Sequence, residues 1–135
     1  MPKTLKKTAS TANFPVRLKG HIWIEGKDGT FLGYGRVALL ESIREHNSIS
    51  KAAKALGISY RRAWFLVDSM NRQLPHPFVE TATGGRKGGG TLVTAAGERA
   101  VKEFWRVHAA FERFLAKEEL QLNRSLQQER RQKIR

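Results

Sequence analysis

The sequence predicts a mainly helical fold with a small β component, and three observations lead to this prediction. Apolar residues recur at helical spacing over residues 36–46 and over residues 59–74. Gly57 interrupts the helical pattern between two short segments, as a turn between helices requires. Two stretches of β-forming residues, 78–83 and 91–94, flank a loop rich in glycine and basic residues. Two short helices, a strand, a loop and a second strand form the layout of a winged helix-turn-helix.

The N-terminal part is expected to hold a tail, a hairpin and a supporting helix. Residues 1–19 are basic, contain no acidic residue and lack the apolar centre of a secretory signal. We therefore expect a flexible tail there, with a short ordered piece near residues 14–18. Alternating residues around Lys27-Asp28-Gly29 predict a β-hairpin over residues 21–32 at an edge of the domain. The helix that follows carries its apolar residues at Val37, Leu39, Leu40 and Ile43.

Two helices joined by a tight turn are expected at the centre of the domain. Ser48 or Ser50 can cap the first of them, and Gly57 suits the left-handed conformation that ends it. Ser59 is a natural N-cap for the second helix, and Pro75 stops that helix. The stripe that the second helix should bury consists of Ala63, Val67, Met70 and Leu74.

A long last helix is predicted from Thr94, which can cap it, to about Leu122, with Glu98 placed favourably in its first turn. Apolar and aromatic side chains recur along it about every 3.5 residues. A domain this small cannot easily cover all of them, so we expect the helix to pair with its copy in a homodimer. The alternative is that these aromatics pack only onto their own domain. The expected dimerisation residues are Val101, Phe104, Trp105, His108, Phe111 and Leu115.

Length and composition indicate a single domain with a polyanionic partner and argue against several other classes of protein. The 135 residues suffice for one domain, which we expect over residues 20–122, with a basic, frayed tail over residues 123–135. Twenty-five Lys and Arg against 12 Asp and Glu give a net charge of +13, so a polyanion is the expected partner. Charge alone does not choose between DNA, RNA and an acidic membrane surface. No apolar run approaches the roughly 20 residues that span a bilayer, and no membrane partner is expected.

The sequence gives no indication of catalysis or of a cofactor. It has no cysteine, which fits a reducing cytosol, and its four histidines show no metal-binding spacing. No Ser-His-Asp grouping or carboxylate pair stands out, so an enzyme is not expected. The glycine-rich loop differs from a P-loop because Gly89-Gly90-Thr91 leads into a strand.

The second of the two central helices is the predicted DNA reader. Opposite its apolar stripe lie Arg61, Phe65, Asp68 and Arg72, so its outward face is largely basic or aromatic. A guanidinium group suits both a guanine edge and a phosphate, and the sequence leaves both open for the two arginines at its start. Tyr60 and Phe65 could contact DNA or pack internally, and we expect partial burial of Trp64. Asp68 is interpreted as a restraint on an arginine, with cytosine recognition as the alternative. The expected contacts of this helix are Ser59, Tyr60, Arg61, Arg62, Trp64 and Phe65.

Two further sets of residues are expected to contact the DNA backbone. Ser48, Ser50, Lys51 and Lys54 around the first central helix could anchor phosphates, although solvated lysines would give the same pattern. Arg86 and Lys87 at the tip of the wing suit an adjacent minor groove or its phosphates.

Three separated blocks of sequence resemble one family of regulators. They are Ile58-Ser59-Tyr60-Arg61-Arg62-Ala63-Trp64, Met70-Asn71, and Val79-Glu80-Thr81-Ala82-Thr83-Gly84-Gly85 with Gly88-Gly89-Gly90. In order and spacing they resemble the N-terminal DNA-binding domain of the ModE-type molybdate-responsive transcriptional regulators. The resemblance runs from about residue 36 to residue 120. The helix-turn-helix part is also similar to the broader LysR-type regulators.

The resemblance implies a winged helix-turn-helix that binds operator DNA as a homodimer. In the family, a separate pair of C-terminal domains binds molybdate, and this chain ends before such domains could fit, so molybdate binding by this chain is not expected. By matching position, the family's recognition helix would include Ser59, Tyr60, Arg61 and Trp64, and its wing Arg86 and Lys87.

The leading hypothesis is a cytoplasmic, nucleoid-associated, non-enzymatic regulator that binds double-stranded DNA in a sequence-specific manner. We expect this regulator to act as a repressor and to control genes for molybdate transport or metabolism. We also expect a homodimer that places two recognition helices in successive major-groove faces. The alternative is a winged-helix interaction module that binds an acidic partner without reading DNA sequence.

Overall fold

A computed structural model describes residues 16–82 and 90–134, with side chains described over 16–81 and 90–129. The chain divides into two units. Residues 22–108 form the first, which we call the winged unit. The segment up to His21 and the segment from Ala109 onward form the second, the terminal unit. One helix, α5 (Ala95–Ile134), contributes residues to both units.

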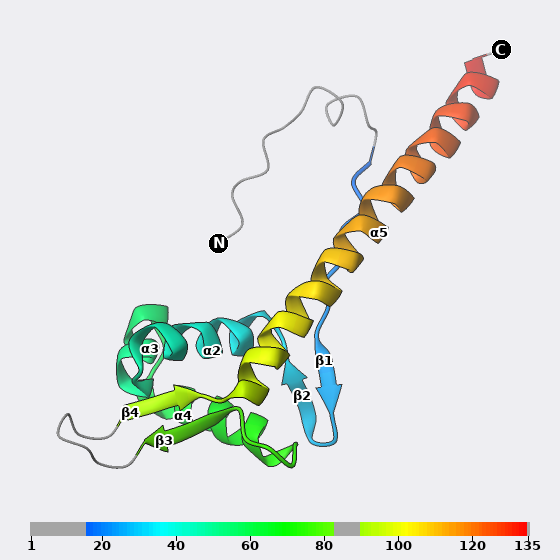
Figure 1. Cartoon of the computed structure of the whole chain (residues 1–135). Helices are drawn as coiled ribbons and strands as arrows, with labels where there is room; N and C mark the ends of the chain where they lie inside the picture. Colours follow the sequence, from blue (N-terminus) through cyan, green and yellow to red (C-terminus); the bar gives the residue numbers. More distant parts are fainter. Residues whose placement is uncertain (1–15, 83–89, 135) are drawn as a thin grey trace. The chain divides into compact units, whose positions relative to one another are not determined.

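The winged unit has the predicted order of elements (Figure 1). Three helices precede a hairpin whose second strand leads into α5, and a smaller hairpin lies at the start of the unit. Both hairpins are two-stranded antiparallel sheets. The predicted mainly helical fold with a β wing is thereby confirmed. Its elements are β1 (Ile24–Gly26), β2 (Gly29–Leu32), α2 (Tyr34–His46), α3 (Ile49–Leu56), α4 (Tyr60–Arg72), β3 (Val79–Ala82), β4 (Gly90–Val93) and the first part of α5.

Local capping fixes where the central helices start and stop. Ser48 caps α3 by accepting a hydrogen bond from the backbone N–H of Lys51, whereas Ser50 lies inside the helix. Gly57 ends α3 with a φ of 70°, in the left-handed region that favours glycine. Ser59 caps α4 by accepting from the backbone N–H of Arg62. These caps confirm the predicted turn between the two helices.

The core of the winged unit joins α2, α3 and α4 through residues that the sequence pattern indicated. Val37, Leu39, Leu40 and Ile43 of α2 are fully buried, as are Ala52 of α3 and the α4 residues Ala63 and Met70. Each fully buried Val, Leu, Ile or Met side chain contributes about 1.5–3 kcal/mol relative to exposure. The core therefore fixes which face of α4 points inward.

Leu74 was wrongly expected in the buried stripe of α4, since its side chain is 38% exposed. The reason is that α4 ends at Arg72, with Gln73 as its C-cap, so Leu74 no longer follows the helical path. Leu66 and Ser69 are buried from the flank of the helix instead.

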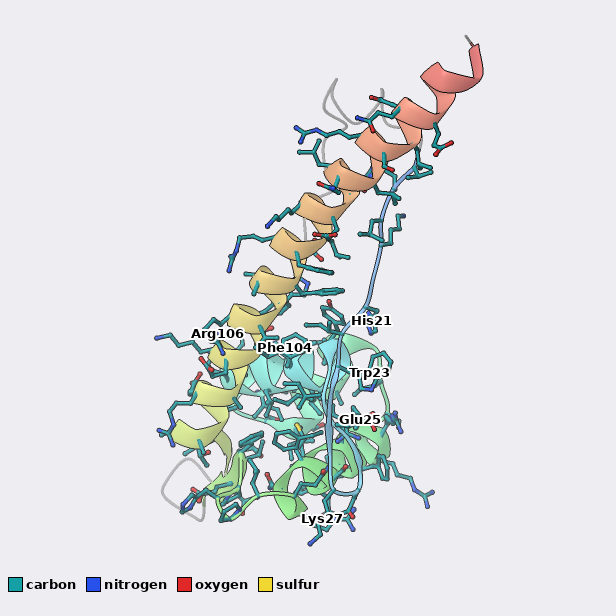
Figure 2. The ribbon with its side chains drawn as sticks, turned by 90° about the vertical axis from the view of Figure 1, so that its right-hand side faces the viewer. His21, Trp23, Glu25, Lys27, Phe104 and Arg106 are labelled. Carbon is teal, nitrogen blue, oxygen red and sulfur yellow. The ribbon has the colours of Figure 1, made fainter. Side chains whose placement is uncertain are left out.

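The prediction that Val101 and Phe104 contact a second copy in a dimer was also wrong. Both are buried in the core of their own winged unit, Phe104 completely, and its ring meets Tyr34 edge-on at 5.4 Å between ring centroids. Figure 2 shows Phe104 directed from α5 into the unit and Arg106 directed away from it. A repeat of apolar residues selects one side of a helix, but it does not say which surface covers that side.

Trp105 and His108 also contact their own unit. The indole N–H of Trp105 donates to a carboxylate oxygen of Glu41 at 3.0 Å, although 38% of Trp105 stays exposed. The rings of Tyr34 and His108 meet edge-on at 5.3 Å. The alternative that aromatic residues of this helix pack onto their own domain therefore holds for its first part.

In the terminal unit, the segment that follows residue 15 is tied to α5. The amide of Asn123, which is buried, accepts from the backbone N–H of Val16 and donates to its carbonyl oxygen. Glu119 accepts from the backbone N–H of Leu18 and from Arg17, and these contacts hold the pKa of Glu119 below its usual range. Gly20 passes against the Phe111 ring, where a Cβ atom would lie only 2.5 Å away.

The predicted end of the last helix is too early, because α5 continues from Leu122 to Ile134. The prediction counted the apolar repeat only as far as Leu122 and placed the end of the helix there. The Gln, Glu, Arg and Lys residues that follow are good helix formers, and Asn123 is buried rather than acting as a stop. Among the described helices, none has both the length and the apolar character that crossing a membrane requires.

We expect Phe104→Ala to lower the free energy of unfolding by about 3–5 kcal/mol, because it removes a fully buried ring and leaves a cavity. Urea unfolding followed by circular dichroism measures this. Phe65→Ala is the matched control: its ring is 52% exposed, and a loss of about 1 kcal/mol or less is expected. Equal losses in the two variants would contradict the position of Phe104 in the core.

Candidate nucleic-acid interface

The outer face of α4, defined by Arg61, Phe65, Asp68 and Arg72, is open to solvent as predicted. Asp68 and Arg72 form an ion pair at 3.3 Å, with both side chains more than 60% exposed. The ion pair agrees with the interpretation of Asp68 as a restraint on an arginine, and the arginine is Arg72. Within the described part of the chain, no ion pair involves Arg61 or Arg62, so Asp68 leaves both available to an anion.

One flank of α4 faces the wing. Tyr60 and Trp64 lie on it, and their rings meet edge-on at 6.2 Å. Trp64 is 37% exposed, in agreement with the predicted partial burial, whereas Tyr60 is 56% exposed. Neither ring belongs to the buried core. Both aromatic side chains therefore remain available for contact with a partner.

Asn71, further along the same flank, ties α4 to the wing. Its side-chain oxygen accepts from the backbone N–H groups of Phe78 and Val79, at 2.8 and 3.3 Å. Its side-chain nitrogen donates to the carbonyl oxygen of Val79 at 3.0 Å. These bonds set the start of β3 relative to the end of α4.

The opposite flank of α4 faces α2 and the first hairpin. Arg36 of α2 donates from Nη1 to the hydroxyl of Ser69 at 2.8 Å. Gln73 donates to the carbonyl oxygen of Thr30 at 3.3 Å and accepts from the backbone N–H of Asp28 at 3.4 Å. Arg62 lies on this flank too, with its guanidinium carbon 5.3 Å from the centre of the Phe65 ring.

Burial of Arg36, together with repulsion by the nearby Arg62, lowers the pKa of Arg36 from its ordinary value. Sequence reasoning did not identify Arg36 or Gln73 as residues of this site. The only local signal was their position at the ends of predicted helices. Their contacts depend on the packing of α2 and the hairpin against α4.

A groove of about 310 Å³ lies between the start of α3, the start of α4 and the wing. The wing approaches by its backbone: the N–H of Thr91 donates to the carbonyl oxygen of Asn47 at 3.1 Å. Gly90 permits this approach, since a Cβ atom would lie 3.2 Å from the same oxygen. The groove is lined by Asn47, Ser48, Ile49, Ser50, Tyr60, Trp64, Thr81, Gly90 and Thr91.

Of the described residues that were predicted to contact the DNA backbone, only Ser48 and Ser50 are among those that line this groove. The Ser48 hydroxyl already accepts the capping bond from Lys51. The side chains of Lys51 and Lys54 are exposed on α3. Arg86 and Lys87 at the tip of the wing lie outside the described residues.

The winged unit has a second hollow, which is separate from the outer face of α4. This larger cavity of about 590 Å³ lies between β2, the loop after α4 and the start of α5, and its lining is mostly apolar. It includes none of the outer-face residues of α4. In the described ranges, no group of three or more His, Asp or Glu side chains is placed to hold a metal ion.

A capped three-helix core with a β wing, and with the polar face of its third helix exposed, defines a winged helix-turn-helix domain. Residues 35–98 match the model of the bacterial regulatory helix-turn-helix protein, lysR family, so this region is a helix-turn-helix domain of the LysR type. The DNA-binding domain in the crystal structure of the CbnR_DBD–DNA complex shares the fold, with a TM-score of 0.50 and 16% identity. That likeness covers 67% of this chain and 99% of the other.

Within this class, the chain is similar to regulators of the ModE type. It is 40% identical over 97 residues to the molybdenum-pterin-binding protein MopB of Rhodobacter capsulatus, covering 72% of this chain and 36% of MopB. It is 47% identical over 73 residues to the molybdenum transport protein ModE of Azotobacter vinelandii, covering 54% and 27%. It is 45% identical over 67 residues to the DNA-binding transcriptional dual regulator ModE of Escherichia coli K12, covering 50% and 26%. The chain thus spans about a quarter to a third of these relatives' length.

Asn71→Ala should lower the free energy of unfolding by about 1–3 kcal/mol, because it leaves the buried polar groups at the start of β3 without partners. Asn71→Asp keeps the acceptor and loses the donor, so a smaller loss is expected. Urea unfolding gives both values, and hydrogen exchange at the Val79 amide localises the effect. An unchanged exchange rate in Asn71→Ala would show that Asn71 does not hold the wing.

Proposed function

We propose that this chain is a sequence-specific DNA-binding transcriptional regulator that inserts α4 into the major groove. The observation that carries the proposal is the outer face of α4, where Arg61 is exposed and unpaired with any acidic side chain of the described residues. The LysR-type domain and the relatives named as transcriptional regulators support a regulatory, non-enzymatic role. The net charge of +13 favours a polyanionic partner and rapid association with it.

The geometry of the winged unit suits a duplex. A major groove about 12 Å wide admits one helix, whose first turns then reach the base edges. In this position Arg61 can contact bases, while Ser50, Lys51 and Lys54 on α3 meet the phosphate backbone. The groove beside Tyr60 and Trp64 offers room for sugar and phosphate groups on the wing side. Arg86 and Lys87 complete the proposed contacts in an adjacent groove.

The proposed active form is a homodimer joined through the terminal unit. Because Val101 and Phe104 are buried in the winged unit, we place the dimer contact in the later part of α5. Phe114 is 55% exposed and Leu122 is 39% exposed, while Phe111 and Leu115 are half-buried beside them. Such a stripe is stabilised when a second helix covers it. Two copies would then read half-sites about 10 base pairs apart, or a multiple of that spacing.

We further propose that the regulated genes serve the transport or metabolism of molybdenum compounds, with repression as the mode. The relatives' names support this, since they include a molybdenum transport protein and molybdenum-pterin-binding proteins. In this proposal the chain binds DNA but does not bind molybdate. It acts in the cytoplasm, where it associates with the nucleoid. Calorimetric titration with molybdate tests this: no stoichiometric heat is expected, and a clear binding isotherm would overturn it.

Selection from a random duplex library should enrich a defined, nearly palindromic motif. Arg61→Ala should weaken binding to that motif by about 1–3 kcal/mol and remove the preference at one base pair per half-site. Fluorescence anisotropy with single-base variants of the motif measures both effects. Arg72→Ala is the control on the same face, and its smaller loss follows from the pairing of Arg72 with Asp68.

A uniform loss over all sequences for Arg61→Ala would identify Arg61 as a phosphate contact. Absence of any enriched motif for the wild-type chain would instead support an interaction module that binds an acidic protein.

Leu122→Glu should convert the homodimer to monomer, because it places a charge in the apolar seam. Sedimentation velocity over a concentration series measures the change. Leu120→Glu is the matched control: Leu120 has the same 39% exposure but lies on the opposite side of α5. A wild-type monomer at all concentrations, or equal effects of the two variants, would contradict this dimer.

A further inference from the structure

Arg36 is the one basic side chain of α2 that reaches the flank of α4. It lies in the first turn of α2, and its Nη1 donates to the Ser69 hydroxyl at 2.8 Å. Ser69 is 8% exposed, so one edge of the guanidinium group is held by a buried partner. Arg36 itself is only partly buried. The hydrogen bond to Ser69 thus orients the guanidinium group, and its other N–H groups lie beside α4.

Arg62 comes to the same flank from α4 itself. It precedes Ser69 by seven residues, about two turns of helix, so both project from the same side. The guanidinium group of Arg62 lies over the Phe65 ring, so the Arg62 side chain runs along the surface of α4. The effect of Arg62 on the pKa of Arg36 agrees with this proximity of the two positive charges.

Among the described residues, Arg36 and Arg62 each differ from an arginine of the same helix that pairs with a carboxylate. Arg44, also on α2, pairs with Glu98 at 2.7 Å, and Arg72 on α4 pairs with Asp68. In the part of the chain that the structure describes, no ion pair involves Arg36 or Arg62. Two like charges held together repel each other unless an anion lies between them.

We propose that Arg36 and Arg62 together bind one phosphate of the DNA backbone, on the flank of α4 opposite the wing. The inference rests on the proposed function and assigns a new contact to it, from a helix outside the helix-turn-helix. Guanidinium groups suit a phosphate because their N–H groups match its oxygens in pairs. The recognition helix is then held by backbone contacts on both flanks, the wing-side groove and this arginine pair, while Arg61 is left to read bases.

The test is the salt dependence of binding to the selected duplex, measured by fluorescence anisotropy. Each phosphate that a protein neutralises contributes about 0.9 to the slope of log K against log salt. The double variant Arg36→Gln/Arg62→Gln should lose about 0.9 of slope, as one shared phosphate requires. Each single variant should lose part of this and weaken binding about tenfold, equally for the selected and scrambled duplexes. A loss of about 1.8 in the double variant would indicate two separate phosphates and overturn the shared site.

Three further variants separate a phosphate contact from a structural role. Arg44→Gln makes the same charge change on the same helix and should leave the slope unchanged. Arg36→Lys keeps the charge and should retain most of the slope. Ser69→Ala removes the anchor of Arg36 and should lower affinity with the slope unchanged. If Arg36→Gln behaves like Ser69→Ala, Arg36 only joins α2 to α4 and the proposal is wrong; thermal melts of each variant confirm folding at the binding temperature.

The selection experiment separates this inference from the proposed function. A wild-type chain that enriches no duplex motif overturns the proposed function, and the phosphate contact with it. A wild-type chain that binds its motif, combined with an unchanged slope in the double variant, overturns the phosphate contact alone.

Discussion

The burial of one side of α4 against α2 and α3 is the constraint on which the rest of the winged unit depends. Ala63, Val67 and Met70 are almost completely excluded from solvent, and this fixes the rotation of the helix about its axis. Because an α-helix has about 3.6 residues per turn, a fixed inner side determines the outer side as well. The outer face therefore follows from the buried side alone, and its four residues, Arg61, Phe65, Asp68 and Arg72, all point to solvent.

Each flank of α4 is then fastened by hydrogen bonds to a different neighbour. Asn71 joins it to the first strand of the wing, and Ser69 and Gln73 join it to α2 and to the first hairpin. These bonds satisfy polar groups that would be costly if buried alone, and they place the wing and Arg36 at set positions beside the outer face. The surface that we propose for DNA is thus the part of α4 that neither the core nor these bonds occupy.

Helix α5 combines a structural part with an exposed part. Its first turns belong to the core of the winged unit through Val101 and Phe104, and Trp105 is bonded to Glu41 of α2. Its later turns carry the apolar stripe of the terminal unit, partly covered by the segment around Gly20. A single periodic pattern therefore serves two kinds of packing, which explains why one assignment for the whole helix failed.

Local sequence alone determined the order of elements, the caps at Ser48, Ser59 and Thr94, the turn at Gly57 and the outward face of α4. These features depend on hydrogen bonds and periodicities within a few residues, so they can be predicted from short stretches of the chain. The burial of Phe104 in its own unit and the bond of Arg36 to Ser69 depended on the tertiary structure. Periodicity shows which side chains point the same way, whereas only the packing of distant segments decides what they meet.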